Sequence, residues 1–339
     1  MMVRSRKKGS SSASSKHTEG DVSKDRPKQR RLCSFCLKFT VVLLLLYAFA
    51  ALSFVKCTWI QRELIYVNRL RIPFFSNLSD PSEFGLHHRT KHFFLTHQDS
   101  QCKIGVWYVP RVSTTEAPNS LADGYPVVLY LHGNTGTRGT YPRIGVYKYL
   151  SEEKNCHVVT FDYQGFGDSD CYPNENNIME DGLLVWKWIK EMAPNARVYL
   201  WGHSLGSGAA THLTLTLQSL GTAPYAVLLD APFTNMVEAA YNHPFGLPFK
   251  PLGEIFYSYM HENHSSIDRI LHIECDIMIF HSHNDYIIPY HLGRKLYETA
   301  VSKRNSKSGK VTFVNCGDQA HKYNYLSKEL RKAVKTFIQ

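Results

Sequence analysis

The chain has 339 residues, of which 43% are hydrophobic and 13% aromatic, so it is long and apolar enough to bury a sizeable core. Its formal net charge is +10, but residues 1–38 hold 11 Lys and Arg against 3 Asp and Glu and supply +8 of that charge. The nearly neutral remainder excludes a basic nucleic-acid-binding face, and we expect no nucleic-acid partner.

Residues 1–38 are rich in Ser, Lys and Arg and contain almost no apolar side chain before Leu32. A segment with so little apolar surface cannot offset the entropy of ordering, so we predict a disordered basic tail. Cys33 and Cys36 stand at its end, beside an apolar run. They are candidates for S-palmitoylation, with ordinary juxtamembrane residues as the alternative.

Residues 39–55 form a run of 17 uncharged, mostly apolar residues between Lys38 and Lys56. With its flanks, the run predicts a transmembrane anchor over residues 39–57. A cleaved signal peptide is the alternative, because Ala48-Phe49-Ala50 offers a small-x-small site, but the preceding polar segment is much longer than a normal n-region. The basic flank predicts a cytosolic tail, with the bulk of the protein lumenal or extracellular.

The membrane-proximal segment is predicted over residues 58–90. Within residues 59–75, apolar side chains recur near helical spacing with arginines between them. This pattern indicates either an amphipathic helix lying on the bilayer or a linker helix packed on the following domain. The apolar positions are Ile60, Leu64, Val67 and Leu70.

Two glycosylation sequons follow the anchor, at Asn77-Leu78-Ser79 and Asn263-His264-Ser265, and both fit a lumenal domain. Six cysteines also follow Lys56, where an oxidising compartment permits disulfides, but their spacing predicts no particular pairing. No pair of CxxC motifs of the zinc-binding kind is present, so we expect no metal.

From residue 91 to 339, short apolar runs alternate with longer segments of helical periodicity. This alternation predicts a mostly parallel central sheet with helices on both faces, preceded by the single membrane helix. One interval, residues 231–275, is far longer than a crossover needs and predicts an inserted lid. We expect strands at 92–97, 102–109 (the first two possibly a hairpin), 126–131, 157–162, 197–201, 226–230, 276–281 and 310–314, and helices at 142–154, 178–193, 207–220, 291–304 and 326–339.

The strand ending near Trp201 runs into Gly202-His203-Ser204-Leu205-Gly206, and a helix of small residues follows. In this strand–turn–helix context the sequence G-x-S-x-G forms a nucleophile elbow, in which a sharp turn exposes the serine hydroxyl at the sheet edge. Larger side chains beside the turn would clash, so Gly202 and Gly206 are required. Ser204 is the predicted nucleophile.

A serine hydroxyl needs a base and an acid that orients the base, which follow the nucleophile along the chain in this kind of fold. Asp285 stands in the loop after strand 276–281, and His321 stands in the loop after strand 310–314. Loops that follow parallel strands emerge at one edge of the sheet, so we predict that Ser204, Asp285 and His321 form the catalytic triad.

Several other residues compete for these roles. Asp230, at the end of strand 226–230, is the rival acid, because some folds of this kind place the acid one strand earlier. His281 and His283 come too early in the chain to be the base. We interpret His203 as a packing residue and Asp318 as a turn residue.

The strand over residues 126–131 ends in the glycine-rich loop 132–139. Glycines allow backbone N–H groups to face a substrate, so we predict that the N–H groups of Asn134 and Leu205 form an oxyanion hole. The loop lacks the lysine and spacing of a phosphate-binding loop, and a triad of this kind needs no cofactor.

Six motifs together resemble the α/β-hydrolase superfamily and, within it, the family of α/β-hydrolase domain-containing protein twelve. The resemblance covers residues 58–339 and implies the same roles for Ser204, Asp285, His321 and Asn134. The chain departs from the family at Gln164, where arginine is common. The motifs are HGNTGTRG, DYQGFGDS, WGHSLGSG, DAPFTN, HSHNDYIIP and AHKYNY.

The resemblance implies a membrane-anchored serine hydrolase that cleaves the acyl ester of lysophospholipids, notably lysophosphatidylserine, and of monoacylglycerols. It also implies a site facing the lumen of the endoplasmic reticulum, although the tail lies outside the resemblance and the plasma membrane stays an alternative. The other hypotheses are an acyl-protein thioesterase or peptidase on the same scaffold, and a scaffold protein without catalysis.

Overall fold

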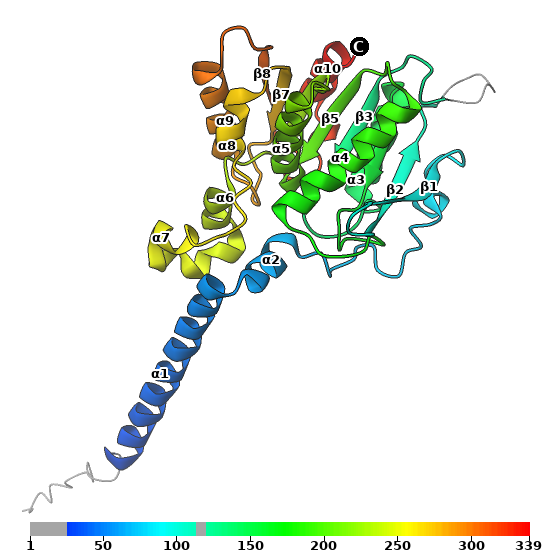
Figure 1. The fold of residues 1–339 in the computed structure, drawn as a ribbon. Helices are drawn as coiled ribbons and strands as arrows, with labels where there is room; N and C mark the ends of the chain where they lie inside the picture. Colours follow the sequence, from blue (N-terminus) through cyan, green and yellow to red (C-terminus); the bar gives the residue numbers. More distant parts are fainter. Residues whose placement is uncertain (1–25, 113–119) are drawn as a thin grey trace, which may run out of the picture. The chain divides into compact units, whose positions relative to one another are not determined.

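The computed structural model describes residues 26–112 and 120–339 of the chain (Figure 1). These residues fall into two compact units, one ending at Leu52 and the other running from Ser53 to Gln339. The second unit holds every predicted site residue.

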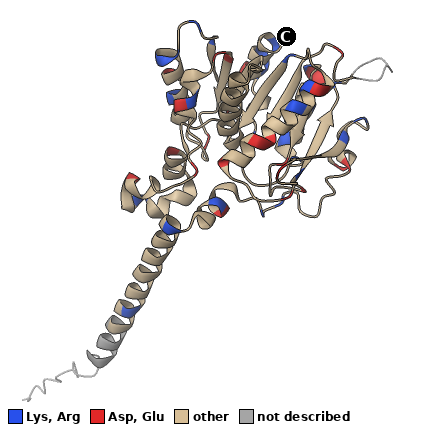
Figure 2. Cartoon of the chain, in the orientation of Figure 1, with Lys and Arg blue, Asp and Glu red and all other residues tan. Residues whose placement is uncertain are grey.

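The first unit is most of helix α1 (Arg26–Lys56). Its stretch Ser34–Lys56 is long and apolar enough to cross a membrane, and Figure 2 shows few charged residues along it. The prediction of a disordered tail over residues 1–38 is wrong from Arg26 onward, because basic residues with good helix propensity extend a helix once an apolar segment has nucleated it. Residues 1–25 and the side chain of Cys33 lie outside the described part, whereas Cys36 is exposed on the helix.

Helix α2 (Thr58–Tyr66) follows directly, and the helix expected over residues 59–75 ends at Val67, whose φ is 48°. Beyond that residue the carbonyl groups of Leu70 and Ile72 bond to a loop of the hydrolase unit rather than to a continuing helix, and Pro73 cannot continue a helix. Gln61 and Ile65 are buried against the unit, whereas Trp59 and Leu64 are exposed. A short 3₁₀ turn, η1 (Pro81–Phe84), precedes the sheet.

The sheet has eight strands in the order β1-β2-β4-β3-β5-β6-β7-β8. The first two form the predicted antiparallel hairpin, β2 also pairs antiparallel with β4, and all other pairs are parallel. The carboxyl ends of β3, β5, β7 and β8 therefore meet at one edge. The strands are β1 (Lys91–Thr96), β2 (Lys103–Val109), β3 (Val127–Leu131), β4 (His157–Phe161), β5 (Val198–His203), β6 (Ala226–Asp230), β7 (Asp276–His281) and β8 (Val311–Asn315).

Helices cover both faces of this sheet, as the continuous apolar strands require. Helices α3 and α10 pack on the face that carries Tyr130 and Trp201, and α4, α5 and α9 cover the opposite face (Figure 1). A single π turn, η2 (Tyr149–Glu153), extends α3, and η5 (Asn324–Leu326) precedes α10. The helices are α3 (Tyr141–Lys148), α4 (Glu175–Met192), α5 (Leu205–Ser219), α9 (Tyr290–Lys303) and α10 (Lys328–Phe337).

The predicted lid interval consists of short helices. The first three are α6 (Met236–Asn242), η3 (Pro244–Leu252) and α7 (Gly253–Tyr257), which leave Phe245 and Ile255 82% and 75% exposed. The last two, α8 (Ser266–Arg269) and η4 (Ile270–His272), belong to the body, because Ser266 contacts Thr211 of α5. Only the first part of the interval is therefore free to cover a site.

A disulfide joins Cys102, just before β2, to Cys171 in the loop after β4. The sequence left this pairing open, because the two cysteines are 69 residues apart and meet only through the pairing of β2 with β4. The remaining described cysteines are unpaired: Cys36, Cys57, Cys156, Cys275 and Cys316.

Candidate active site

The turn between β5 and α5 holds Ser204 with a φ of 52° and a ψ of −118°. This conformation is strained for a residue with a side chain and is typical of a nucleophile elbow. A Cβ atom on Gly202 would lie 2.2 Å from the carbonyl oxygen of Gly206, and one on Gly206 would lie 2.1 Å from that of Leu131. Both positions therefore exclude every residue except glycine.

Asp285 and His321 meet at the same edge of the sheet. Asp285 Oδ2 lies 2.7 Å from His321 Nδ1 and 3.1 Å from His281 Nε2, and Oδ1 accepts the N–H groups of Ile287 (2.9 Å) and Ile288 (2.8 Å). Burial alone would raise the pKa of Asp285, but the hydrogen bonds with His281 and His321 hold it well below its ordinary value. The carboxylate is thus ionised and its orientation is fixed.

His321 contacts His203, the residue that precedes the serine. His203 Nε2 lies 2.9 Å from the carbonyl oxygen of His321, and the two rings are 4.9 Å apart. Burial, and then the neighbouring His321, lowers the pKa of His203 well below its ordinary value, so this ring stays neutral. His203 is therefore a packing residue, but one that positions the backbone of His321.

Because Asp285 occupies Nδ1 of His321, Nε2 is the ring nitrogen left for a substrate or a nucleophile. Within the described residues, no hydrogen bond joins this nitrogen to Ser204 Oγ. Catalytic hydrogen bonds of this kind are often long in free enzymes and tighten when substrate binds.

The rival residues make other contacts, although His281 touches Asp285 and the backbone carbonyl of Asp230 accepts the N–H of Ser204 (2.9 Å). Asp230 Oδ1 accepts a hydrogen bond from Asn324 Nδ2 (2.7 Å) and Oδ2 accepts one from Trp201 Nε1 (3.4 Å), and among the described residues no hydrogen bond joins this carboxyl to His321. Burial raises the pKa of Asp230 to about 7. His283 Nε2 contacts Asn315, and Asp318 is exposed.

The loop after β3 is held by hydrogen bonds from two parts of the chain. From α3, the buried Arg143 donates hydrogen bonds to several of its carbonyl groups. From the segment after α2, the carbonyl groups of Tyr66, Leu70 and Ile72 accept its N–H groups. A Cβ atom on Gly133 would lie 3.3 Å from Ser204 Cβ, so the loop borders the serine. The described residues offer no acceptor to the N–H groups of Asn134 and Leu205, which leaves both donors open.

Sequence reasoning missed Arg143 and the segment from Ile65 to Ile72. Arg143 stands in the first turn of a helix, where an arginine is usually exposed, and no spacing pattern distinguishes it. The segment from Ile65 to Ile72 was interpreted as part of a helix, and its carbonyl groups carry no signal in the sequence.

Glu175, Glu262 and His264 offer three ligand atoms within 4.8 Å of one another, an arrangement that would suit a metal ion. Their charges are already matched, however. Arg62 Nε lies 2.7 Å from Glu262 Oε1, and Arg269 contacts Glu175. Tyr66 Oη adds a hydrogen bond to Glu262 Oε2 (2.9 Å). We interpret the cluster as an ion-pair network that ties α2 to residues 262–269.

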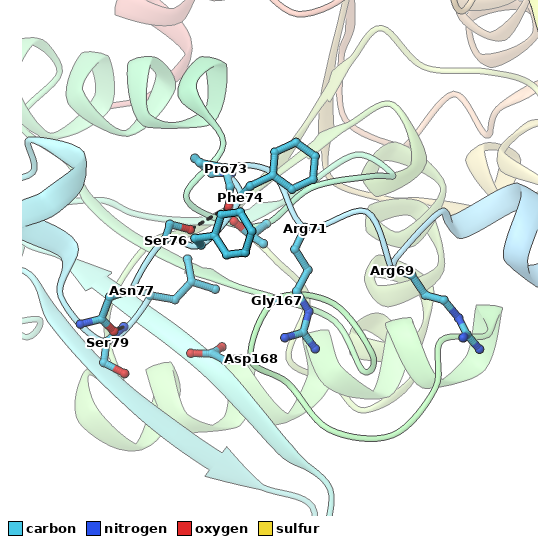
Figure 3. A pocket seen from close by; sticks show the side chains of 12 residues that line it. Arg69, Arg71, Pro73, Phe74, Ser76, Asn77, Ser79, Gly167 and Asp168 are labelled. Carbon is cyan, nitrogen blue, oxygen red and sulfur yellow. Dashed lines mark hydrogen bonds between the residues drawn. The ribbon is translucent and has the colours of Figure 1, made fainter.

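A surface cavity of about 460 Å³ lies apart from Ser204. Figure 3 shows Arg69 and Arg71 on one side of it and Asn77 and Ser79 on the other. The cavity reaches Thr137 of the loop after β3, but none of Ser204, Asp285 and His321 lines it. It therefore belongs to the membrane-proximal segment rather than to the triad.

Comparison with known proteins agrees with this geometry. Residues 126–220 match the family described as "alpha/beta hydrolase fold". The solved α/β-hydrolase of Vibrio vulnificus has a TM-score of 0.64 at 17% identity, covering 82% of this chain and 92% of that one. The esterase Pf2001 of Pyrococcus furiosus has a TM-score of 0.58 at 18% identity, covering 79% and 96%. The fold is that of an α/β-hydrolase.

Relatives in sequence narrow the class. Lysophosphatidylserine lipase ABHD12 of Rattus norvegicus is 36% identical, covering 95% of this chain and 85% of the relative. The protein of the same name from Xenopus tropicalis is 37% identical, covering 88% and 82%. Protein ABHD12B of Homo sapiens is 32% identical, covering 78% and 76%. The chain belongs to the ABHD12 family of α/β-hydrolases and is an ester hydrolase.

Proposed function

We propose that the protein is a membrane-anchored serine lipase that releases fatty acid from lysophosphatidylserine, with monoacylglycerols as further substrates. The relatives named lysophosphatidylserine lipase favour this substrate. The observation that carries the proposal is the Asp285–His321 pair at the sheet edge that also carries the strained Ser204.

The proposed reaction is acyl transfer in two steps. Ser204 Oγ attacks the ester carbonyl while His321 Nε2 takes its proton, and Asp285 holds the imidazole in the required tautomer. The oxyanion accepts hydrogen bonds from the N–H groups of Asn134 and Leu205. His321 then protonates the leaving glycerol oxygen, and water cleaves the acyl-enzyme by the same route. The chemistry requires neither a metal nor a cofactor.

The bilayer is the proposed source of substrate. Phe54, in the stretch long enough to span a membrane, stacks on Phe256 of α7 with ring centroids 5.0 Å apart. Trp59, Leu64, Phe245 and Ile255 expose apolar surface on α2 and the lid. Such a surface suits a membrane interface, at which single-chain lipids are available.

We propose that the tail is cytosolic and the hydrolase unit lumenal, with the endoplasmic reticulum as the first expectation and the plasma membrane as the second. The basic flank before the anchor supports this orientation. The Cys102–Cys171 disulfide is typical of an oxidising compartment. Asn77 and Asn263 are both exposed, as glycosylation acceptors must be.

The test uses the full-length protein in detergent, with lysophosphatidylserine, other lysophospholipids, monoacylglycerols, acyl thioesters and peptides as substrates. We expect fatty-acid release from lysophosphatidylserine that Ser204→Ala abolishes. If a fluorophosphonate probe labels Ser204 but no lipid is cleaved, the nucleophile stands and the lipase proposal is wrong. Preferential cleavage of thioesters or peptides would favour the corresponding alternative, and the absence of both labelling and turnover would favour a non-catalytic scaffold.

A further inference from the structure

Arg143 is a buried arginine whose guanidinium group donates hydrogen bonds to the loop after β3. Its Nη1 donates to the carbonyl oxygen of Thr137 (2.6 Å). Its Nη2 donates to the carbonyl oxygens of Gly133 (2.9 Å), Asn134 (3.2 Å) and Thr135 (2.7 Å). Four carbonyl groups of the loop after β3 therefore bind one side chain that is only 6% exposed, and the Gly133 oxygen also lies 2.7 Å from His132 Nδ1.

In a trans peptide the C=O and the following N–H point in opposite directions. A carbonyl group held by Arg143 therefore turns the next N–H away from Arg143. The loop illustrates this rule directly. The carbonyl groups of Asn134 and Thr135 bind Arg143, and the N–H groups that follow them donate to the carbonyl oxygens of Tyr66 (3.1 Å) and Leu70 (2.9 Å).

The same holds for Thr137, because the N–H group that follows it donates to Asp162 Oδ1 (2.6 Å). Three of the four peptides that Arg143 holds by their oxygen thus have an occupied N–H. The exception is the peptide between Gly133 and Asn134. Its oxygen binds Arg143, its N–H has no acceptor among the described residues, and Gly133 adjoins Ser204. The loop is built to leave this one donor open.

We propose that Arg143 is a positioning residue for the oxyanion hole, which fixes the direction of the Asn134 N–H before substrate arrives. This role rests on the proposed acyl-transfer function. A guanidinium group suits it because a planar fork of five N–H donors reaches several carbonyl oxygens at once, whereas a lysine ammonium is a compact point charge. A donor aligned in advance costs no reorganisation when the oxyanion forms.

The experiment compares the full-length protein with Arg143→Lys and Arg143→Met in detergent. We expect kcat for lysophosphatidylserine to fall about 100-fold in Arg143→Met and about 10-fold in Arg143→Lys, with KM changed less than about 2-fold. Arg304 supplies the matched control. Its guanidinium likewise donates to the carbonyl oxygens of Ile273, Cys275 and Gly309, but at the end of α9 away from the sheet edge that carries Ser204. Arg304→Met is expected to lower the unfolding temperature while keeping the kcat of the folded protein.

Two ligands separate positioning from general structure. An alkyl trifluoromethyl ketone adds Ser204 Oγ to give a hemiketal oxyanion, whereas an ether analogue of the lipid binds without forming one. We expect Arg143→Met to weaken ketone binding in proportion to kcat and to leave ether binding unchanged. An equal loss for both ligands, or an unchanged kcat in folded Arg143→Met, would overturn the proposal. If Arg143→Met does not fold, Arg143→Lys decides by the same comparison.

The ketone also keeps this proposal separable from the lipase assignment. If the wild type binds the ketone but hydrolyses no lipid, and Arg143→Lys weakens the ketone alone, Arg143 positions the hole and the substrate assignment is wrong. If lipid is hydrolysed and both ligands bind Arg143→Lys as they bind the wild type, the lipase proposal stands and the role of Arg143 is wrong.

Discussion

At the scale of single residues, two buried carboxyl groups near the carboxyl edge of the sheet have opposite environments. Asp285 accepts two backbone N–H groups and contacts two imidazoles, which keep it ionised. Asp230 has one short and one long hydrogen bond, and burial raises its pKa to about 7. Two aspartates at neighbouring strand ends therefore suit different tasks, because their hydrogen-bond donors differ.

The first prediction contrasts these two aspartates. In Asp285→Asn the amide preserves shape but favours the wrong tautomer of His321, so we expect kcat to fall by about 10⁴. Asp230→Asn, the matched control, is expected to keep kcat within about 3-fold, a difference of under 1 kcal/mol. Steady-state hydrolysis of lysophosphatidylserine measures both. The reverse order of effects would make Asp230 the acid.

A second prediction concerns stability and pH. Burial raises the pKa of folded Asp230 above the unfolded value of about 3.9, so the folded state binds this proton more tightly. Its contribution to the free energy of unfolding is fully present below about pH 4 and is lost as pH rises through about 7. We therefore expect Asp230→Asn to gain unfolding temperature relative to wild type between pH 5 and pH 8. An equal difference in unfolding temperature between Asp230→Asn and wild type at pH 5 and at pH 8 would contradict this.

Gln164 illustrates what could be inferred at this scale. The family resemblance implies an arginine at this position, and the structure gives the contacts that Gln164 makes instead. Buried Asp181 accepts hydrogen bonds from Gln164 N–H (2.8 Å) and Nε2 (2.9 Å), and lies 2.7 Å from His97 Nε2. The hydrogen bond to Asp181 raises the pKa of His97. The imidazole of His97, the residue after β1, thus contacts this buried carboxylate, and no local pattern could have predicted that pairing.

At the scale of elements, the sequence predicted what depends on local pattern. All eight strands, and the five helices that flank the sheet, arise at the expected places, because continuous apolar runs and helical periodicity are local signals. The segment after Tyr66 was wrong, because its backbone groups bond to a loop some 65 residues away in the chain. Ser204 and the glycines around it could be predicted because five consecutive residues define the nucleophile elbow. Arg143 could not be predicted, because it binds backbone atoms and belongs to no sequence motif.

The third prediction tests the tie between α2 and the body. Buried Glu262 accepts hydrogen bonds from Arg62 Nε (2.7 Å), Tyr66 Oη (2.9 Å) and the N–H of Glu175 (2.6 Å). Glu262→Ala leaves buried donors without a partner, so we expect a loss of about 2–3 kcal/mol in the free energy of unfolding. Thermal unfolding in detergent measures it, with Glu254→Ala on the exposed face of α7 as the control. Equal unfolding temperatures for the two variants would exclude a structural role for the network.

The fourth prediction concerns the lid. Because Phe245 and Ile255 expose apolar side chains where we place the bilayer, the double variant Phe245→Ser/Ile255→Ser should dock less well on lipid. We expect its activity on vesicle-borne lysophosphatidylserine to fall about 30-fold or more, since two apolar side chains together contribute more than about 2 kcal/mol, while a short soluble ester is cleaved at the wild-type rate. Val301→Ser, exposed on α9, is the control. Equal losses on both substrates would place the lid's role in chemistry rather than in docking.

At the scale of the whole molecule, the sequence indicated a membrane helix followed by a hydrolase. The structure has a helix long and apolar enough to cross a membrane, followed by an α/β-hydrolase fold. Charge gave the direction of insertion as an expectation, and the disulfide adds support that the sequence could not, because Cys102 and Cys171 meet only in the folded sheet. Long-range contacts of this kind need the fold before they can be found.

The fifth prediction tests this orientation. If the hydrolase unit is lumenal, removal of N-linked glycans should increase gel mobility, and the double variant Asn77→Gln/Asn263→Gln should abolish that shift. Single variants assign each acceptor. A tag before Arg26 should at the same time be digested by protease added to sealed microsomes. A protected tag, with no shift for the wild type, would reverse the topology.

The short distance along the chain between the anchor and the loop beside Ser204 has a consequence for how such enzymes can be rearranged. The carbonyl groups of Tyr66, Leu70 and Ile72 lie within 16 residues of Lys56 and hold that loop. A recombination event that exchanged the anchor after Tyr66 would also remove part of the scaffold of the active site. A recombination that exchanges the anchor and keeps the enzyme active must therefore cross over before Thr58. The anchor can then be replaced separately from α2, which must be inherited together with the hydrolase unit although no linker separates the two helices.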